Sequence, residues 1–231
     1  MAALRPNGMH HIALTTGDIK AQIEYFSDVL GAKLVGFYWM HGTEGKFHAF
    51  LELSPSSTVA LVYGPDIKEI PSTLDVTHAR TPGHPCAPGT LQHFAFNVDS
   101  VDDLLAMRDR IRSRGIVCFG PIDHGMCNSI YFAGLEGLNL EVSTSAEAID
   151  AQVWIDQEVV DLAGISAEEL ARYKNPAEFK APLGSVAQPS VDPSKPQMAY
   201  DPEVYKAMLA MPDEALSAAN DFAAPPANPA P

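Results

Sequence analysis

The residues with the greatest capacity for chemistry lie within residues 123–142, near the middle of the chain. The pattern is typical of two short strands joined by a glycine-bearing turn over residues 134–137. Side chains of a strand alternate between its two faces. Apolar residues take one face, whereas Tyr131 and Glu141 take the other, and His124 precedes the first strand. A carboxylate, a phenol and an imidazole on one sheet face predict a site. The alternative is an ordinary hairpin with solvated polar residues.

Two histidines occupy matched positions in an internal repeat. His93 follows His11 by 82 residues, and Phe119 follows Phe37 by the same offset. Each histidine lies in an expected first strand, on the face with small neighbours. A repeat that keeps its register indicates duplication.

The elements around these residues predict an α+β fold. A strand over 9–15 is followed by a helix that Asp18 would cap and Gly31 would end, and then by three more strands. The order recurs in the second half, where residues 116–119 form an expected strand. We expect two paired βαβββ modules that form one cupped mixed sheet around a metal site. The expected ranges are 8–145 for this domain, about 8–64 and 90–145 for its modules, 65–89 for the link and 146–231 for a C-terminal arm.

A pseudosymmetric pairing of the modules would bring His11, His93 and Glu141 together. Two neutral imidazoles and a carboxylate with open positions suit non-haem Fe(II). Mn(II), Ni(II) and Zn(II) would accept the same ligands. The neighbouring His10 falls on the opposite strand face, so we expect it to pack nearby rather than to bind metal; a shift of one residue in the register would exchange the two histidines.

The opening segment resembles that of vicinal oxygen chelate proteins. It contains His-Ile-Ala-Leu from His11, then Asp18, then Tyr-Phe-Ser-Asp-Val-Leu-Gly ending at Gly31. This group includes glyoxalases, fosfomycin-resistance enzymes, bleomycin-binding proteins and type I extradiol dioxygenases. The resemblance covers about residues 8–145 and implies the paired βαβββ fold.

The stretch 123–142 is most similar to the signature of type I extradiol dioxygenases. The matching residues are His124, Ile130, Tyr131, Gly137 and Glu141, whereas Leu135 replaces the usual proline and Gly134 replaces the usual Asp, Glu, Asn, Thr or Ala. The resemblance implies iron bound by His11, His93 and Glu141, and a catechol whose oxygens His124 and Tyr131 would hydrogen-bond. It also implies O2 as co-substrate and a place in aromatic catabolism.

One residue of the extradiol pattern is missing. Those enzymes carry a further acid–base histidine on the strand that here spans 58–63, which contains none. His48, His78 and His84 are the candidates to replace it. A glyoxalase-like enzyme, a fosfomycin-type transferase and a metal-free binding protein are the alternatives. A glyoxalase-like enzyme would need a carboxylate from each module, and a fosfomycin-type transferase would need a basic site. A metal-free binding protein would not need the three predicted metal ligands.

The composition of the chain limits the partners and the cellular compartment that we expect. The 231 residues carry a net charge of −14, which argues against nucleic acid and anionic membrane surfaces as partners. Three cysteines form neither a disulfide framework nor a zinc pattern, and no signal peptide or membrane span is evident. We therefore expect a cytoplasmic protein that takes a small molecule and O2 and forms a homo-oligomer.

The last part of the chain is rich in proline and alanine. A capping box at Ser166 and an Asp-Pro pair at Asp201 predict short helices. An apolar cluster over 153–162 is expected to pack on the body of the protein, and a later apolar patch over 204–211 to reach a neighbouring subunit or cover the site. The final residues are expected to be disordered.

Overall fold

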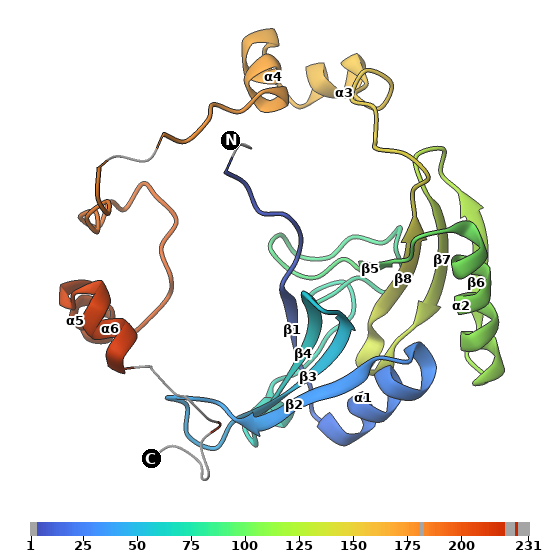
Figure 1. Cartoon of the computed structure of the whole chain (residues 1–231), viewed down its shortest axis with the longest axis horizontal. Coiled ribbons are helices and arrows are strands. Elements are labelled where there is room, and N and C mark those ends of the chain that lie inside the picture. Colours follow the sequence, from blue (N-terminus) through green and yellow to red (C-terminus); the bar gives the residue numbers. More distant parts are fainter. Residues whose placement is uncertain (1–3, 181–182, 220–224, 226–231) are drawn as a thin grey trace.

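The computed structural model describes residues 4–180, 183–219 and 225, and shows two βαβββ modules (Figure 1). The elements of module 1 are β1 (His11–Thr15), α1 (Ile19–Tyr25), the π-helix η1 (Phe26–Leu30), β2 (Lys33–Trp39), β3 (Phe47–Ser54) and β4 (Ser57–Tyr63). The helical segment begins at Asp18, whose side chain accepts a hydrogen bond from the Ala21 amide at 3.0 Å. It ends at Gly31, which has the left-handed conformation that glycine adopts readily.

Module 2 repeats the order after a connection that contains the short 3-10 helix η2 (Ile67–Glu69). Its elements are β5 (Phe94–Asn97), α2 (Val101–Ser113), β6 (Cys118–Asp123), β7 (Asn128–Ala133), the 3-10 turn η3 (Leu135–Gly137) and β8 (Asn139–Thr144). The arm carries α3 (Gln157–Leu162), α4 (Ala167–Lys174), α5 (Pro202–Ala210) and α6 (Asp213–Ala219). Ser166 forms the predicted capping box, and Asp201 caps α5.

The strands form two four-stranded mixed sheets. Their orders are β1-β4-β3-β2 and β5-β8-β7-β6, and in each the first strand pairs in parallel with the last strand of its module. The predicted α+β class and paired βαβββ modules are confirmed. The expected single sheet is wrong, because no ladder joins β1–β4 to β5–β8 within the described residues.

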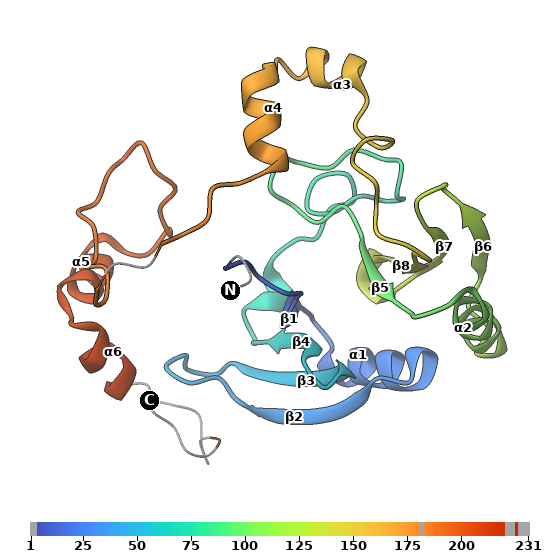
Figure 2. The ribbon, with the colours of Figure 1, turned by 45° about the horizontal axis from the view of Figure 1, so that its top comes forward.

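The two modules share one hydrophobic core. It receives Leu51 and Leu61 from the first sheet and Ile130 and Leu140 from the second, all at most 1% exposed. Helices α1 and α2 lie side by side in both ribbon views (Figures 1 and 2). The apolar face of each sheet therefore turns toward the other module.

Polar contacts fix the same junction. The Arg110 guanidinium donates to the Val29 carbonyl at 2.9 Å, and the Tyr25 hydroxyl donates to the Ala133 carbonyl at 2.6 Å. Burial, followed by the nearby Cys118, raises the pKa of Tyr25 to about 12, so this phenol stays a neutral donor. The modules are thus joined through their helix-side faces, and the open face of each sheet points away from the shared core.

The arm stands apart from both sheets in two orientations (Figures 1 and 2). Val160 is buried, but Val159 is 60% and Leu162 81% exposed. The expected packing of the 153–162 cluster on the body is therefore largely wrong. Trp154 lies against the hairpin of module 2, since a Cβ on Gly125 would lie 2.6 Å from its ring.

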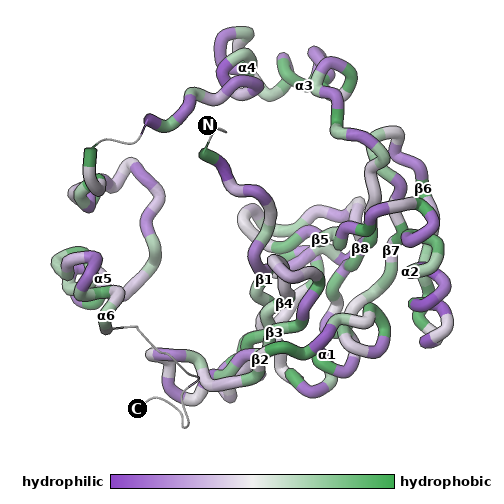
Figure 3. Tube along the Cα trace, in the orientation of Figure 1, coloured by the Kyte–Doolittle hydropathy of each residue, from purple (hydrophilic) through white to green (hydrophobic). Residues whose placement is uncertain are grey.

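The tube coloured by hydropathy shows apolar residues along the strands and again around α3, where they lie in the open (Figure 3). The proline- and alanine-rich end that we expected to be disordered falls on residues 220–231, of which all but 225 lie outside the described residues. In the described part of the chain, no helix has the length and apolar character needed to cross a bilayer.

Candidate functional site

His93 and Glu141 form the centre of the candidate site. His93 immediately precedes β5, Glu141 lies on β8, and these two strands pair in parallel. The His93 Nε2 and Glu141 Oε2 atoms are 3.0 Å apart. Glu141 is 6% exposed although it lies on the open face of the sheet. Two of the three predicted metal ligands are thus in contact.

The surroundings of Glu141 favour its charged form. Burial alone would raise its pKa, but hydrogen bonds from Ser129, Ser143 and Tyr131, together with the nearby His93, hold the pKa of this carboxyl below its ordinary value. The Ser143 hydroxyl donates to Glu141 Oε1 at 2.6 Å and lies 2.8 Å from the Ser129 hydroxyl. Sequence alternation placed Ser129 on this face but gave neither serine a role.

His124 and Tyr131 lie together, as the signature implies. The His124 Nε2 atom is 2.9 Å from the Tyr131 hydroxyl, and Tyr131 lies directly opposite Glu141 in the β7–β8 ladder. Since the phenol donates to Glu141, its oxygen is free to accept from His124 Nε2–H. Burial is the main cause that raises the pKa of Tyr131, and the bond and charge of Glu141 add to it. This phenol therefore remains protonated at neutral pH.

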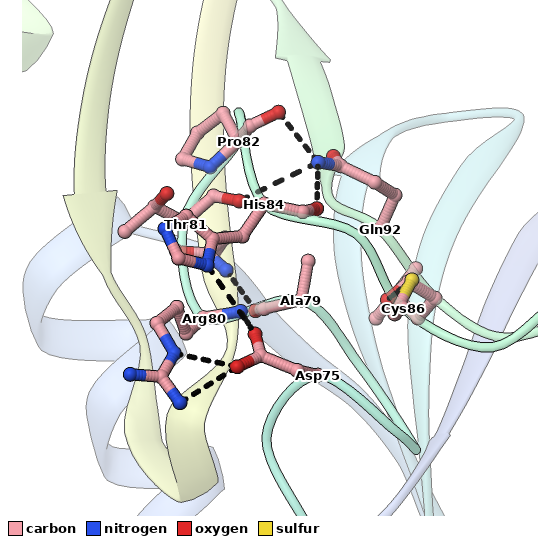
Figure 4. A network of polar contacts seen from close by, with 10 residues as sticks. Asp75, Ala79, Arg80, Thr81, Pro82, His84, Cys86 and Gln92 are labelled. Carbon is pink, nitrogen blue, oxygen red and sulfur yellow. Dashed lines mark hydrogen bonds and ion pairs between the residues drawn. The ribbon is translucent and has the colours of Figure 1, made fainter.

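Gln92 orients His93 and was not identified from the sequence. Its amide nitrogen donates to three carbonyls of the connection between the modules, those of Thr81, Pro82 and His84 (Figure 4). Because carbonyl oxygens only accept hydrogen bonds, the end of the Gln92 amide that faces these three carbonyls must be the nitrogen. The Gln92 carbonyl oxygen consequently faces His93 Nδ1, with which it is in contact. A proton on Nδ1 would leave Nε2, the atom that faces Glu141, without one, as the predicted role of His93 as a metal ligand requires.

The same connection is ordered by a second set of contacts. Asp75 binds the Arg80 guanidinium at 2.6 Å and lies 3.7 Å from His84 Nδ1 (Figure 4). His78 is buried, with Nδ1 2.9 Å from the Thr77 hydroxyl and Nε2 against Gly137. His78 and His84 thus support the connection and the η3 turn.

His11 does not join the His93–Glu141 pair. Its Nδ1 is 2.9 Å from Nδ1 of His10, and its ring packs on Phe50 with centroids 6.0 Å apart. Within the described residues, no group of three His, Cys, Asp or Glu side chains could hold a metal ion. The expectation that the three predicted ligands meet in one chain is wrong. The physical reason is that the modules pack through their helix-side faces. The assignment of each as a metal ligand stays a prediction.

The pairing shows which residue of module 1 corresponds to Glu141. Ala95 pairs with Glu141, and its counterpart Ala13 pairs with Ala60. Module 1 therefore offers a histidine without a carboxylate, as the sequence predicted. The register also places Phe119 opposite Tyr131 and Gly36 opposite Phe50. Phe119 thus corresponds to Gly36 rather than to Phe37.

Of the candidates for an acid–base histidine, His48 lies on the sheet that carries His11. Its ring packs 4.3 Å from Tyr38 and 4.8 Å from Phe50, measured between ring centroids. Burial, then the neighbouring His41 and His11, lowers the pKa of His48. The ring is therefore neutral at neutral pH.

A separate cavity of about 850 Å³ lies between the end of β1, the connection and the η3 turn. Thr15, Lys68, His78 and Glu136 are among its lining residues. Glu136 already accepts hydrogen bonds from Gly17 N at 2.7 Å and Gln22 Nε2 at 2.8 Å. This cavity does not include the His93–Glu141 pair.

Comparisons with known proteins identify the family of the chain. The family model described as Glyoxalase/Bleomycin resistance protein/Dioxygenase superfamily matches residues 8–142. The chain belongs to this superfamily, which confirms the resemblance found in the sequence.

Two curated relatives come from Rhodococcus globerulus. The chain is 27% identical over 132 residues to biphenyl-2,3-diol 1,2-dioxygenase 3, and 30% identical over 132 residues to biphenyl-2,3-diol 1,2-dioxygenase 2. Each match covers 57% of this chain and 60% of the relative. A solved glyoxylase/bleomycin resistance protein/dioxygenase domain from Frankia sp. EAN1pec matches 61% of this chain and 99% of its own length, with 16% identity and a TM-score of 0.47.

Proposed function

We propose that this protein is a metal-dependent oxygenase of the extradiol type, which cleaves the ring of a catechol with O2. The observation that carries the proposal is the continuous contact from His124 through Tyr131 to Glu141, with 2.9 Å between the first two. The similarity to two biphenyl-2,3-diol dioxygenases supports the choice of substrate class.

The chain's own residues would act on the two catechol oxygens. Tyr131, kept protonated by burial, can donate a hydrogen bond to a catecholate oxygen, and His124 can hold or pass a proton at the same position. Glu141 is anionic and shielded from solvent. We expect Fe(II), with Mn(II), Ni(II) or Zn(II) as possible occupants. One chain brings together two of the three donors expected for it, His93 and Glu141.

The test is oxygen consumption by anaerobically Fe(II)-loaded protein given a panel of catechols. A turned-over catechol should yield a yellow ring-opened product. Tyr131→Phe should lower kcat at least about 100-fold, the low end of what the loss of a positioned proton donor costs, with little change in metal content. Tyr63→Phe is the matched control, because Tyr63 lies on β4 of module 1. If no catechol consumes O2, the proposal is wrong.

A further inference from the structure

His124 lies on the exposed loop that joins β6 to β7. The hydrogen bonds that close this loop are local. The His124 amide donates to the Cys127 carbonyl at 2.9 Å, and the Gly125 amide donates to Asp123 Oδ1 at 2.7 Å. An exposed loop held by local bonds opens easily. The contact of His124 Nε2 with the Tyr131 hydroxyl at 2.9 Å nevertheless requires the imidazole to stay in place.

The indole ring of Trp154 covers this loop from outside. A Cβ built on Gly125 would lie 2.6 Å from Cη2 and 2.9 Å from Cζ2 of the ring, so the ring occupies the space beside this glycine. Gly125 has φ of +81°, in the left-handed region that glycine adopts readily. Any other residue at position 125 would therefore be strained and would also displace the ring.

The segment that carries Trp154 is itself ordered. The amides of Val153 and Trp154 both donate to the Asp150 carbonyl at 3.0 Å. Two residues after Trp154, Asp156 caps α3 by accepting a hydrogen bond from the Glu158 amide at 2.8 Å. Trp154 therefore lies between a closed turn and a capped helix, which limits how far its ring can move.

Trp154 belongs to the arm and lies beyond residues 8–142, which the family model matches. The helices α4–α6 stand away from both sheets (Figures 1 and 2). Trp154 is 46% exposed, less than Val159 at 60% or Leu162 at 81% on the helix that follows it. The arm thus places an aromatic ring on module 2 at the loop that carries His124.

We propose that Trp154 is a positioning residue, which holds the loop so that the imidazole of His124 stays against Tyr131. The ring acts through Gly125, the residue that follows His124 directly. The kinetic consequence rests on the proposed function, in which His124 holds or passes a proton at a catechol oxygen. The contact between Trp154 and the loop does not rest on it.

The test measures hydrogen exchange of the His124 amide by NMR in the full-length protein. In Trp154→Ala this amide should exchange about tenfold faster than in the wild type, because the loop loses the apolar contact that opposes its opening. The Met40 amide is the internal reference, since it donates to the Lys46 carbonyl at 2.9 Å in the loop between β2 and β3, and its exchange should not change. Tyr173→Ala is the matched control, because it removes a 55% exposed aromatic ring from α4 of the same arm.

Two results of this measurement would overturn the proposal. One is a His124 amide that exchanges equally fast in Trp154→Ala and in the wild type. The other is equal acceleration of the His124 and Met40 amides, because this would show that the whole protein is destabilised rather than one loop.

A second variant tests the same contact from the loop. Gly125→Ala should displace the indole ring and also accelerate exchange of the His124 amide. Adding Trp154→Ala to it should then have little further effect, because residues in contact are not additive. Fully additive effects would contradict the proposed coupling. If Trp154→Ala does not fold, as judged by circular dichroism, Gly125→Ala decides alone, and unchanged exchange there counts against the contact.

A kinetic measurement tests whether Trp154 acts through His124. With Fe(II)-loaded protein and a catechol that the wild type cleaves, Trp154→Ala should lower kcat by roughly 10–100-fold, as misplacement of a reacting group does, with KM nearly unchanged. In a protein that already carries His124→Gln, Trp154→Ala should lower kcat no further. A second fall of equal size would contradict action through His124. If the wild type cleaves no catechol, the proposed reaction is wrong, and amide exchange still decides whether Trp154 holds the loop.

Discussion

Gln92 is the residue through which the connection between the modules acts on the site. Its amide nitrogen is held by three carbonyls, and its oxygen contacts His93 Nδ1. Replacing Gln92 with leucine should lower the affinity for divalent metal about 10–100-fold, the usual cost of losing a partner that orients a ligand. Isothermal titration with Mn(II) measures this. Gln157→Leu on the exposed surface of α3 is the control, and an unchanged affinity in Gln92→Leu would exclude the positioning role.

His48 should make the protein sensitive to mild acid. Its folded pKa is below the ordinary 6.5, so the unfolded chain binds its proton more readily. The resulting stabilisation is present above pH 6.5 and is lost as the pH falls from 6.5 through the folded pKa. In His48→Gln the decline of the free energy of unfolding over that window should be smaller. Urea denaturation at pH 7.5 and 5.5 measures it, and equal declines in both proteins would contradict the assignment.

The hairpin that carries the site depends on the absence of a side chain at one glycine of β6. Gly120 has φ of +107°, and a Cβ there would lie 2.6 Å from the Ser129 carbonyl oxygen. Gly115 has φ of +76° but open space around it. Gly115→Ala should therefore cost about 1–2 kcal/mol of stability, the price of a left-handed backbone. Gly120→Ala should destabilise the protein more than Gly115→Ala does, because the backbone would have to move to relieve the contact with the Ser129 carbonyl.

Thermal unfolding of the two alanine variants compares these costs. If both variants are destabilised equally, the contact of the added Cβ with the Ser129 carbonyl does not contribute to the destabilisation. Gly120→Ala should also weaken metal binding, since Ser129 is next to the hydrogen bonds that hold Glu141.

At the scale of elements, most of the fold could be predicted from local pattern. Strand alternation placed Tyr131 and Glu141 on the open face, and the structure pairs them directly. The predicted strand over 116–119 was misplaced, since β6 spans Cys118–Asp123. The Gly-Pro pair at residues 120–121 is a usual sign of a turn, but here the strand continues past it with a register shift.

The arrangement of the modules could not be predicted in the same way. An apolar sheet face can be covered by helices from either module, and alternation within one strand does not say which. The contact of Arg110 with Val29 involves a helix residue with no special pattern in the sequence. The placement of His11 relative to Glu141 follows from this packing, so the sequence indicates candidate residues for the site but not how they are arranged.

At the scale of the molecule, the arm should be dispensable for folding. The core cluster contains no residue of the described part of the arm, and α3–α6 stand away from the sheets. A chain that ends at Ser145 should keep a cooperative transition, with a melting temperature lowered by at most roughly 4 °C, equivalent to about 1 kcal/mol. A chain that ends at Asp156 is the control, because it keeps Trp154 beside Gly125. A loss of cooperativity at Ser145 would show that the arm belongs to the folding unit.

The core that both modules share is completed within one chain. Dilution does not affect the intramolecular packing of Phe26 and Leu51, so the unfolding midpoint of metal-free protein should be the same at low and high protein concentration. Because each half of the duplicated fold covers the apolar side of the other, the two halves should also unfold together, and neither should be stable when it is produced alone.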